Sequence, residues 1–265
     1  NLPGPPKEMK LMFKNHVVKC LSNLTGEIIK SKTLRIFGVG ESLMAKKIND
    51  IIQGSTNPTV APYAKEYEVT LRVTAKGESE EKCDLLINSK CDEIKCILKE
   101  YIYGEGEKSL DTVVAELLCE KSFSIATAES CTGGMIAATL ISYPGISKVF
   151  KEGAVTYSNE AKIKRLGVSE ETLNKFGAVS KETAKEMAEG MARVANTDIA
   201  ISTTGLAGPD GGTDEKPVGL VYIGIFIKGK IIVEKFNFTG DREAVRRKAT
   251  MNALNILRKE LIREN

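Results

Sequence analysis

The pattern of apolar and polar positions predicts a small unit of strands and helices in the first part of the chain. Residues 66–77 alternate apolar with charged or hydroxyl side chains, which is typical of a half-buried strand. Residues 33–39 form a shorter apolar run, and residues 41–52 repeat apolar side chains at helical spacing. Ser79 can cap a second helix that extends to about Tyr101. Together these segments predict a β-α-β-α unit.

The rest of the chain alternates strands and helices in the manner of an α/β domain. Apolar strands are predicted at 123–128, 153–158 and 198–205, and a hairpin follows at 218–227 and 230–238. The predicted helices cover 110–120, 132–141, 160–166, 170–176 and 180–195, and a last helix begins at Asp241. The predicted fold is therefore α/β, a three-layer domain with a mixed sheet.

The polar segment YGEGEKS, residues 103–109, is expected to link the two units. The predicted organisation is a small α+β domain over 33–103 and an α/β domain over 109–265. Residues 1–32 precede these two predicted domains, and the first few of them are rich in proline and glycine.

Composition and charge narrow the classes of function. A net charge of +3 is too small to favour nucleic acid or a membrane surface as a partner. No apolar run approaches the roughly 18 residues of a membrane span. The six cysteines lack CxxC spacing and only one histidine accompanies them, so no metal site is predicted. Scattered cysteines favour a reducing, cytoplasmic compartment.

The segment TAESCTGG, residues 127–134, is the first candidate for chemistry, because it follows a predicted strand and precedes a predicted helix. Ser130 is the candidate nucleophile, and the N–H groups of Thr132, Gly133 and Gly134 could hold an anion at the helix start. Ser130 could equally be a helix cap. Cys131 is a rival nucleophile, but without a histidine nearby it is better interpreted as a small buried residue.

A base for Ser130 is predicted in the segment TYSNEAK, residues 156–162. Burial and a helix N-terminus would both lower the pKa of Lys162, and a neutral lysine can accept the proton of a serine. Tyr157 could hold the amine by a hydrogen bond. The alternative is an ordinary solvated lysine on the surface.

Two further segments could bind an anionic substrate. Thr204 and Gly205 end a strand and open a glycine-rich loop, 206–217, which could form an anion nest or a flexible surface loop. Arg242 lies in the first turn of the last helix, where a cation opposes the helix dipole unless an anion is bound. Its alternative partners are Asp241 and Glu243.

Five segments resemble motifs of the CinA family. They read TAESCTGG, GAVTYSNEAK, GAVS, GLAGPDGGTDEKPVG and GDREAVRRKA, and they span about residues 109–261. This part is similar to the family's C-terminal nicotinamide mononucleotide (NMN) deamidase domain, and residues 33–103 resemble its KH-like middle domain. The resemblance implies that residues 1–32 are the remnant of a preceding domain with its linker. Nucleic-acid-binding KH loops read GxxG, whereas this turn reads FGVGES, so we expect packing and no RNA binding.

The resemblance implies an amidase that converts NMN to nicotinate mononucleotide and ammonia without a cofactor. It implies Ser130 as nucleophile, Lys162 as base, Tyr157 as an assisting residue, and an oxyanion hole in the backbone after Ser130. We expect a small-molecule substrate, its phosphate on Arg242, and a homodimer. The alternatives are a related amidase on another substrate and a non-catalytic partner protein linked to competence or DNA damage.

Overall fold

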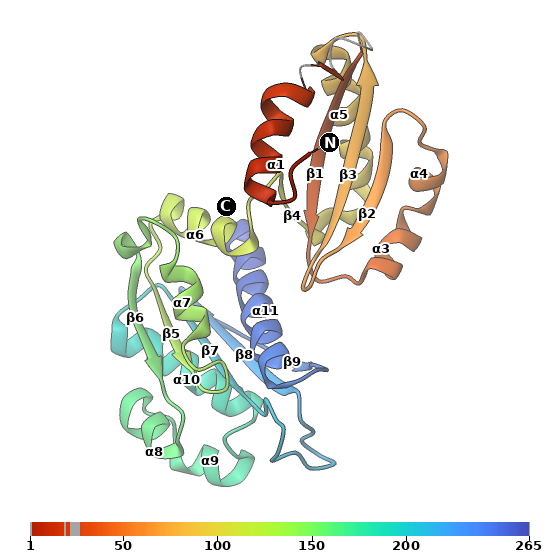
Figure 1. Cartoon of the computed structure of the whole chain (residues 1–265). Coiled ribbons are helices and arrows are strands. Elements are labelled where there is room, and N and C mark those ends of the chain that lie inside the picture. Colours follow the sequence, from red (N-terminus) through yellow and green to blue (C-terminus); the bar gives the residue numbers. More distant parts are fainter. Residues whose placement is uncertain (1, 19, 22–26, 265) are drawn as a thin grey trace. The chain divides into compact units, whose positions relative to one another are not determined.

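The computed structural model describes residues 2–18, 20–21 and 27–264, and the chain divides into two compact units at residues 107 and 108 (Figure 1). Each unit has its own sheet and its own apolar core. Of the predicted segment 1–32, residues 1, 19 and 22–26 lie outside the described residues. Its residues 28–32 belong to strand β1 (Ile28–Ile36) of the N-terminal unit, so the predicted boundary at residue 33 is too late; the assignment of the residues before them to a preceding domain stays a prediction.

The N-terminal unit is built on a four-stranded antiparallel sheet, ordered β2-β3-β1-β4. The strands are β1 (Ile28–Ile36), β2 (Thr59–Ala64), β3 (Val69–Gly77) and β4 (Ile102–Glu105). One face of this sheet packs against the long helix α5 (Glu80–Leu98), whose first turn is capped by the side chain of Ser79 as predicted. Leu34, Leu71 and Ile94 are fully buried between them, so the predicted apolar periodicity produces this core.

Three features of this unit depart from the sequence-based expectation. The predicted helix 41–52 is divided into α3 (Glu41–Lys47) and α4 (Asn49–Gly54) at Ile48, whose backbone leaves the helical region. Strand β2 contains Pro62, which an edge strand tolerates because one side of it needs no ladder bonds. Strand β4 lies in the segment expected to be a linker, where pairing with β1 makes it a strand. Upstream, residues 6–17 form helix α1 (Pro6–Met12) and the π-helical turn η1 (Phe13–Val17).

The C-terminal unit contains the predicted mixed sheet, ordered β6-β5-β7-β8-β9. Its strands are β5 (Ile125–Glu129), β6 (Phe150–Val155), β7 (Ile199–Gly205), β8 (Leu220–Ile227) and β9 (Lys230–Asn237). Strand β5 runs parallel to both β6 and β7, while β8 and β9 form the antiparallel hairpin. Because β5, β6 and β7 are parallel, the segments that follow their carboxyl ends meet at one edge of the sheet.

Helices cover both faces of this sheet (Figure 1). Helix α10 packs across β5, β7 and β8 on one face, whereas α6, α7 and α11 pack on one another and on the sheet on the other face. The longer helices are α6 (Leu110–Lys121), α7 (Met135–Ile141), α9 (Glu170–Phe176), α10 (Lys181–Ala195) and α11 (Arg242–Arg263), and the short turns are η3 (Ile146–Lys148), α8 (Asn159–Ala161) and η4 (Lys162–Leu166). The arrangement is the three-layer α/β architecture that the sequence predicts.

Close packing of α10 on the π-helical turn η4 depends on Gly190. A Cβ atom at Gly190 would lie 2.1 Å from the carbonyl oxygen of Leu166, closer than atoms can approach. The glycine therefore lets η4, which carries Lys162, rest directly on α10.

Gly190→Ala is expected to lower the free energy of unfolding of the C-terminal unit by about 1–3 kcal/mol, because the added methyl overpacks this contact. Gly54→Ala, in the N-terminal unit, is the control: a Cβ atom there meets nothing within 4 Å, and this variant should leave the unfolding of the C-terminal unit as in the wild-type chain. Denaturant unfolding of both variants measures the difference. Equal stability of the two would show that η4 and α10 can separate without cost.

Candidate active site

Ser130 is the first residue after β5, and its backbone is fixed by the neighbouring strand. Its N–H donates to the carbonyl of Thr203 on β7 at 2.9 Å, so the sheet pairing continues one residue past the strand. Helix α7 begins only at Met135, after Gly134, whose φ of 88° lies in the left-handed region that glycine permits. Ser130 is therefore not the cap of α7, and the capping alternative is wrong.

The true partner of the helix start is Glu129, which the sequence analysis did not single out. Its carboxylate accepts the N–H of Ile136 at 3.0 Å and that of Ala137 at 2.8 Å, and the residue is fully buried. A helix N-terminus needs acceptors for these amides and favours negative charge. The only sequence signal was an acidic residue at the end of a buried strand, directly before the candidate nucleophile.

The turn formed by Thr132, Gly133 and Gly134 was expected to bind an anion, but several of its groups are engaged elsewhere. The hydroxyl of Thr132 is buried against that of Thr203 at 2.7 Å, and the carbonyl of Thr132 accepts from Arg246 at 2.8 Å. Gly133 donates its N–H to the carbonyl of Ser130 at 3.1 Å. Thr132, Gly133 and Gly134 do not line the cavity described below, because the helix starts later than predicted and its end is already occupied by Glu129.

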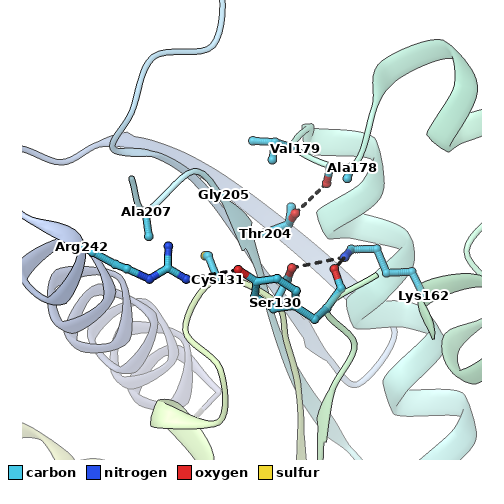
Figure 2. Close-up of a pocket in the computed structure, with 10 residues that line it drawn as sticks. Ser130, Cys131, Lys162, Ala178, Val179, Thr204, Gly205, Ala207 and Arg242 are labelled. Atoms are coloured by element: carbon cyan, nitrogen blue, oxygen red, sulfur yellow. Dashed lines mark hydrogen bonds between the residues drawn. The ribbon is translucent and has the colours of Figure 1, made fainter. Parts of the chain in front are cut away.

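Lys162 is buried next to Ser130, and both residues line the cavity described below. Only 1% of Lys162 is exposed, so the surface alternative is wrong. Its Nζ lies 3.2 Å from Ser130 Oγ, 2.9 Å from the carbonyl oxygen of Thr156 and 3.1 Å from that of Tyr157 (Figure 2). The lysine is the first residue of η4, after the short helix α8 that Ser158 caps. The sequence-based pairing of Ser130 with Lys162 is thus present in the structure.

Burial lowers the pKa of the Lys162 amine from its usual 10.5, because the charged form loses water; the nearby Cys131 opposes this more weakly. The hydrogen-bond geometry can accommodate the neutral form. A neutral amine has two N–H bonds and one lone pair, and two backbone carbonyls take the two N–H bonds here. The lone pair is then available to accept the proton of Ser130, which is what a general base requires.

Cys131 lies beside Ser130 and lines the same cavity, yet it is poorly suited to be a nucleophile. Its side chain is buried, and burial raises the pKa of the thiol to about 11. The thiol is therefore protonated at neutral pH, and the thiolate is the reactive form. This agrees with its interpretation as a small buried residue.

Tyr157 and Arg242 form the exposed wall of the site. The phenol of Tyr157 accepts from Arg242 Nη2 at 3.2 Å, and 61% of the tyrosine is exposed. The expected hydrogen bond from the phenol to the Lys162 amine is absent, since it is the backbone carbonyl of Tyr157 that contacts the amine. Arg242 Nη1 donates to the carbonyl of Gly208 in the glycine-rich loop at 2.8 Å.

Within the described part of the chain, no carboxylate pairs with Arg242. Asp241 caps α11 through the N–H of Ala244, and Glu243 pairs with Arg247. The two alternative partners considered for Arg242 are therefore engaged elsewhere. An unneutralised guanidinium with exposed donors is a site for an anion.

These residues surround one cavity of about 170 Å³. Its lining comprises Ser130, Cys131, Tyr157, Lys162, Ala178, Val179, Thr204, Gly205, Ala207 and Arg242 (Figure 2). The cavity is smaller than the roughly 300 Å³ of common ligand pockets, so it suits the reacting part of a substrate whose remainder extends past Arg242. Thr204 donates its hydroxyl to the carbonyl of Ala178 at 2.6 Å, which ties β7 to the apolar wall. Sequence reasoning missed that wall, since its small apolar side chains carry no chemical signal.

The described residues lack two features that mark other classes of protein. They contain no group of three or more histidine, cysteine, aspartate or glutamate side chains placed to hold a metal ion. None of the helices within residues 2–18, 20–21 and 27–264 is long and apolar enough to cross a membrane.

Comparison with known proteins gives consistent matches to one family. The model of the CinA C-terminal domain matches residues 107–261, and that of the damage-inducible protein CinA KH domain matches residues 31–104. Relatives from Clostridium perfringens and Clostridium kluyveri, named as competence-damage inducible proteins, are 59% and 55% identical over 98% of this chain. The chain spans 63% and 64% of their lengths.

Solved structures match the C-terminal unit. A CinA superfamily protein from Klebsiella pneumoniae is 40% identical with a TM-score of 0.57, over 58% of this chain and 96% of that protein. The competence/damage inducible protein CihA from Agrobacterium tumefaciens is 39% identical with a TM-score of 0.56, over 58% of this chain and 93% of that one.

Covalent labelling of Ser130 by a small fluorophosphonate should become faster as the pH rises, and level off below pH 10.5. Burial lowers the pKa of Lys162 in the folded chain, so the amine becomes able to accept the serine proton within this range and stays unable to do so at lower pH. Lys162→Arg should label slowly at every pH, because a guanidinium remains protonated. Lys164→Arg, an exposed position on the same turn, is the matched control. A rise with pH that survives in Lys162→Arg would assign the base to another group.

Proposed function

This chain belongs to the CinA family, and from that premise we propose that its C-terminal unit hydrolyses the carboxamide of nicotinamide mononucleotide. The products are nicotinate mononucleotide and ammonia. The observation that carries the proposal is the buried contact of 3.2 Å between Ser130 Oγ and Lys162 Nζ at the floor of a cavity. A serine with a desolvated amine as its base can perform acyl transfer without histidine or metal.

In the first half of the reaction, Ser130 Oγ attacks the carboxamide carbon while Lys162 takes the hydroxyl proton. The carbonyl π electrons move to oxygen, and a tetrahedral intermediate forms. When the intermediate collapses, the C–N bond breaks and Lys162 returns its proton to the departing nitrogen, which leaves as ammonia. The result is an ester between Ser130 and the nicotinate group, with Lys162 neutral again.

In the second half, water takes the place of the serine. Lys162 accepts a proton from the attacking water, and the ester C–O bond breaks as Ser130 recovers that proton. The backbone N–H of Cys131, the residue after Ser130 that lines the cavity, is the proposed donor to the oxyanion in both halves. The N–H of Ser130 itself is committed to Thr203, so it is not such a donor.

Arg242 supports a substrate that carries an anionic group beyond the amide. It faces the cavity beside Tyr157, with a guanidinium that no described carboxylate neutralises. The phosphate of a mononucleotide matches this donor set in charge and geometry. The pyridine ring would then lie between Arg242 and the Ser130–Lys162 pair, against Ala178, Val179 and Ala207.

Ser130→Ala is expected to reduce NMN deamidation by several orders of magnitude, because the covalent nucleophile is lost. Lys162→Ala should cost nearly as much, and the double variant little more than either, since the two residues act as one unit. Cys131→Ala should keep most of its activity. Ammonia release from NMN by each purified variant measures these effects.

Circular dichroism and thermal unfolding serve as the controls for folding in this series. If the losses from Ser130→Ala and Lys162→Ala multiply in the double variant, the two residues act independently and the dyad mechanism is wrong. An active Ser130→Ala together with an inactive Cys131→Ala would transfer the nucleophile to the thiol.

Arg242→Ala should raise the KM for NMN by about 10- to 100-fold, the loss expected when a charge-assisted contact is removed. The reaction of nicotinamide riboside, which lacks the phosphate, should change far less. Arg247→Ala is the matched control on the same helix, where the guanidinium pairs with Glu243 in solvent. An unchanged preference for NMN over the riboside in Arg242→Ala would remove Arg242 from the phosphate site.

A further inference from the structure

Glu129 does not line the cavity, yet it is the residue most closely tied to both halves of the Ser130–Lys162 pair. It is the last residue of β5, directly before Ser130, and none of it is exposed. A fully buried carboxylate is rare unless its oxygens are engaged. Its contacts therefore indicate what the residue does.

The side chain of Glu129 closes the turn that presents Ser130. Its two oxygens accept the N–H groups of Ile136 and Ala137 at 3.0 and 2.8 Å, the first-turn amides of α7. The usual capping position holds Gly134, which has no side chain to accept them. The carboxylate thus reaches across the turn and ties the strand that ends before Ser130 to the helix that follows it.

The backbone of Glu129 is tied to the segment that holds the amine. Its carbonyl accepts the N–H of Thr156 at 2.9 Å, and the carbonyl of Thr156 accepts from Lys162 Nζ at 2.9 Å. The side chain of Glu129 therefore bonds to the start of α7, which follows the turn carrying Ser130. Its backbone bonds to Thr156, whose carbonyl accepts from the Lys162 amine.

We propose that Glu129 is a positioning residue that keeps Ser130 Oγ within reach of Lys162 Nζ. The proposal rests on the proposed function only in taking Ser130 as the nucleophile. Glu129 touches neither atom of the pair and is not a proton carrier, because both its oxygens are occupied by backbone amides. Its effect is on distance and direction, to which rates of bond formation are steeply sensitive.

The chemistry requires a carboxylate of this length at position 129. Glutamine offers one acceptor and places an NH₂ donor against a backbone N–H, so one amide loses its partner and the turn must shift. Aspartate keeps both acceptors but is one methylene shorter. The negative charge is stabilised by the N-terminus of α7.

The test measures covalent labelling of Ser130 by a fluorophosphonate, followed by mass spectrometry over a range of pH. Glu129→Gln should label on the order of 10- to 100-fold more slowly than wild type, with the pH midpoint unchanged. Its kcat for NMN should fall by a similar factor at constant KM, since Arg242 is untouched. Asp198→Asn is the matched control, because Asp198 also accepts a backbone N–H, that of Ser124, but near the start of β7 instead of the end that carries the site.

Thermal unfolding establishes that each variant is folded at the assay temperature, and Glu129→Asp takes over the test if Glu129→Gln is not. Labelling of Glu129→Gln at the wild-type rate, or a loss shared by Asp198→Asn, would overturn the proposal. A displaced pH midpoint would overturn it too, since Glu129 would then act on the charge of Lys162 instead of the position of Ser130. Wild-type chain that labels but does not hydrolyse NMN would refute the proposed substrate alone, and wild-type chain that does not label would refute both proposals.

Discussion

The site depends on the burial of one amine. Lys162 lies under Ser130 with almost no contact with solvent, and two backbone carbonyls take its N–H bonds. An ammonium ion in that position would have lost its water without gaining a carboxylate within hydrogen-bonding distance, which favours the neutral amine. In the proposed reaction, burial therefore gives Lys162 the role of base that a histidine has in many serine hydrolases. The rest of the C-terminal unit provides the enclosure and the geometry that this requires.

The parallel part of the sheet supplies that geometry. Strands β5 and β7 lie side by side, and the residues at or after their carboxyl ends include the proposed nucleophile, Ser130, and one wall of the cavity. The segment after the edge strand β6 supplies the carbonyls of Thr156 and Tyr157 that hold the amine. Helix α10 then closes this side, because Gly190 lets η4 approach it directly. Segments that are distant in sequence thus line the same cavity.

Two ionisable side chains are buried close to Ser130, and each is accommodated by a different means. Burial lowers the pKa of Lys162, whereas both carboxylate oxygens of Glu129 accept amides of the start of α7. Arg242, in contrast, keeps its charge at the exposed mouth without a described carboxylate partner. The cavity consequently has a floor with a hydroxyl and a desolvated amine, an apolar wall and a cationic mouth, which fits the proposed substrate, an uncharged amide joined to an anion.

Much of the architecture is readable from local pattern. The alternation of 66–77, the apolar stripe of α10 and the caps at Ser79, Ser180 and Asp241 depend on neighbours in sequence, so they predict elements correctly. The segments carrying Ser130, Lys162 and Arg242 were recognisable for the same reason, since each joins a reactive side chain to the start of a predicted helix.

Contacts between segments distant in sequence determined the features of the fold and the site that local pattern did not predict. Strand β4 is a strand only because β1 pairs with it, and the start of α7 moved to Met135 because the carboxylate of Glu129 takes its amides. The phenol of Tyr157 accepts a hydrogen bond from Arg242, 85 residues away in sequence, while its backbone carbonyl accepts one from the Lys162 amine. The sequence by itself determined which elements form and which side chains carry reactive groups. Only the tertiary structure decided which of them meet and which charges are buried, because those depend on partners that no local pattern specifies.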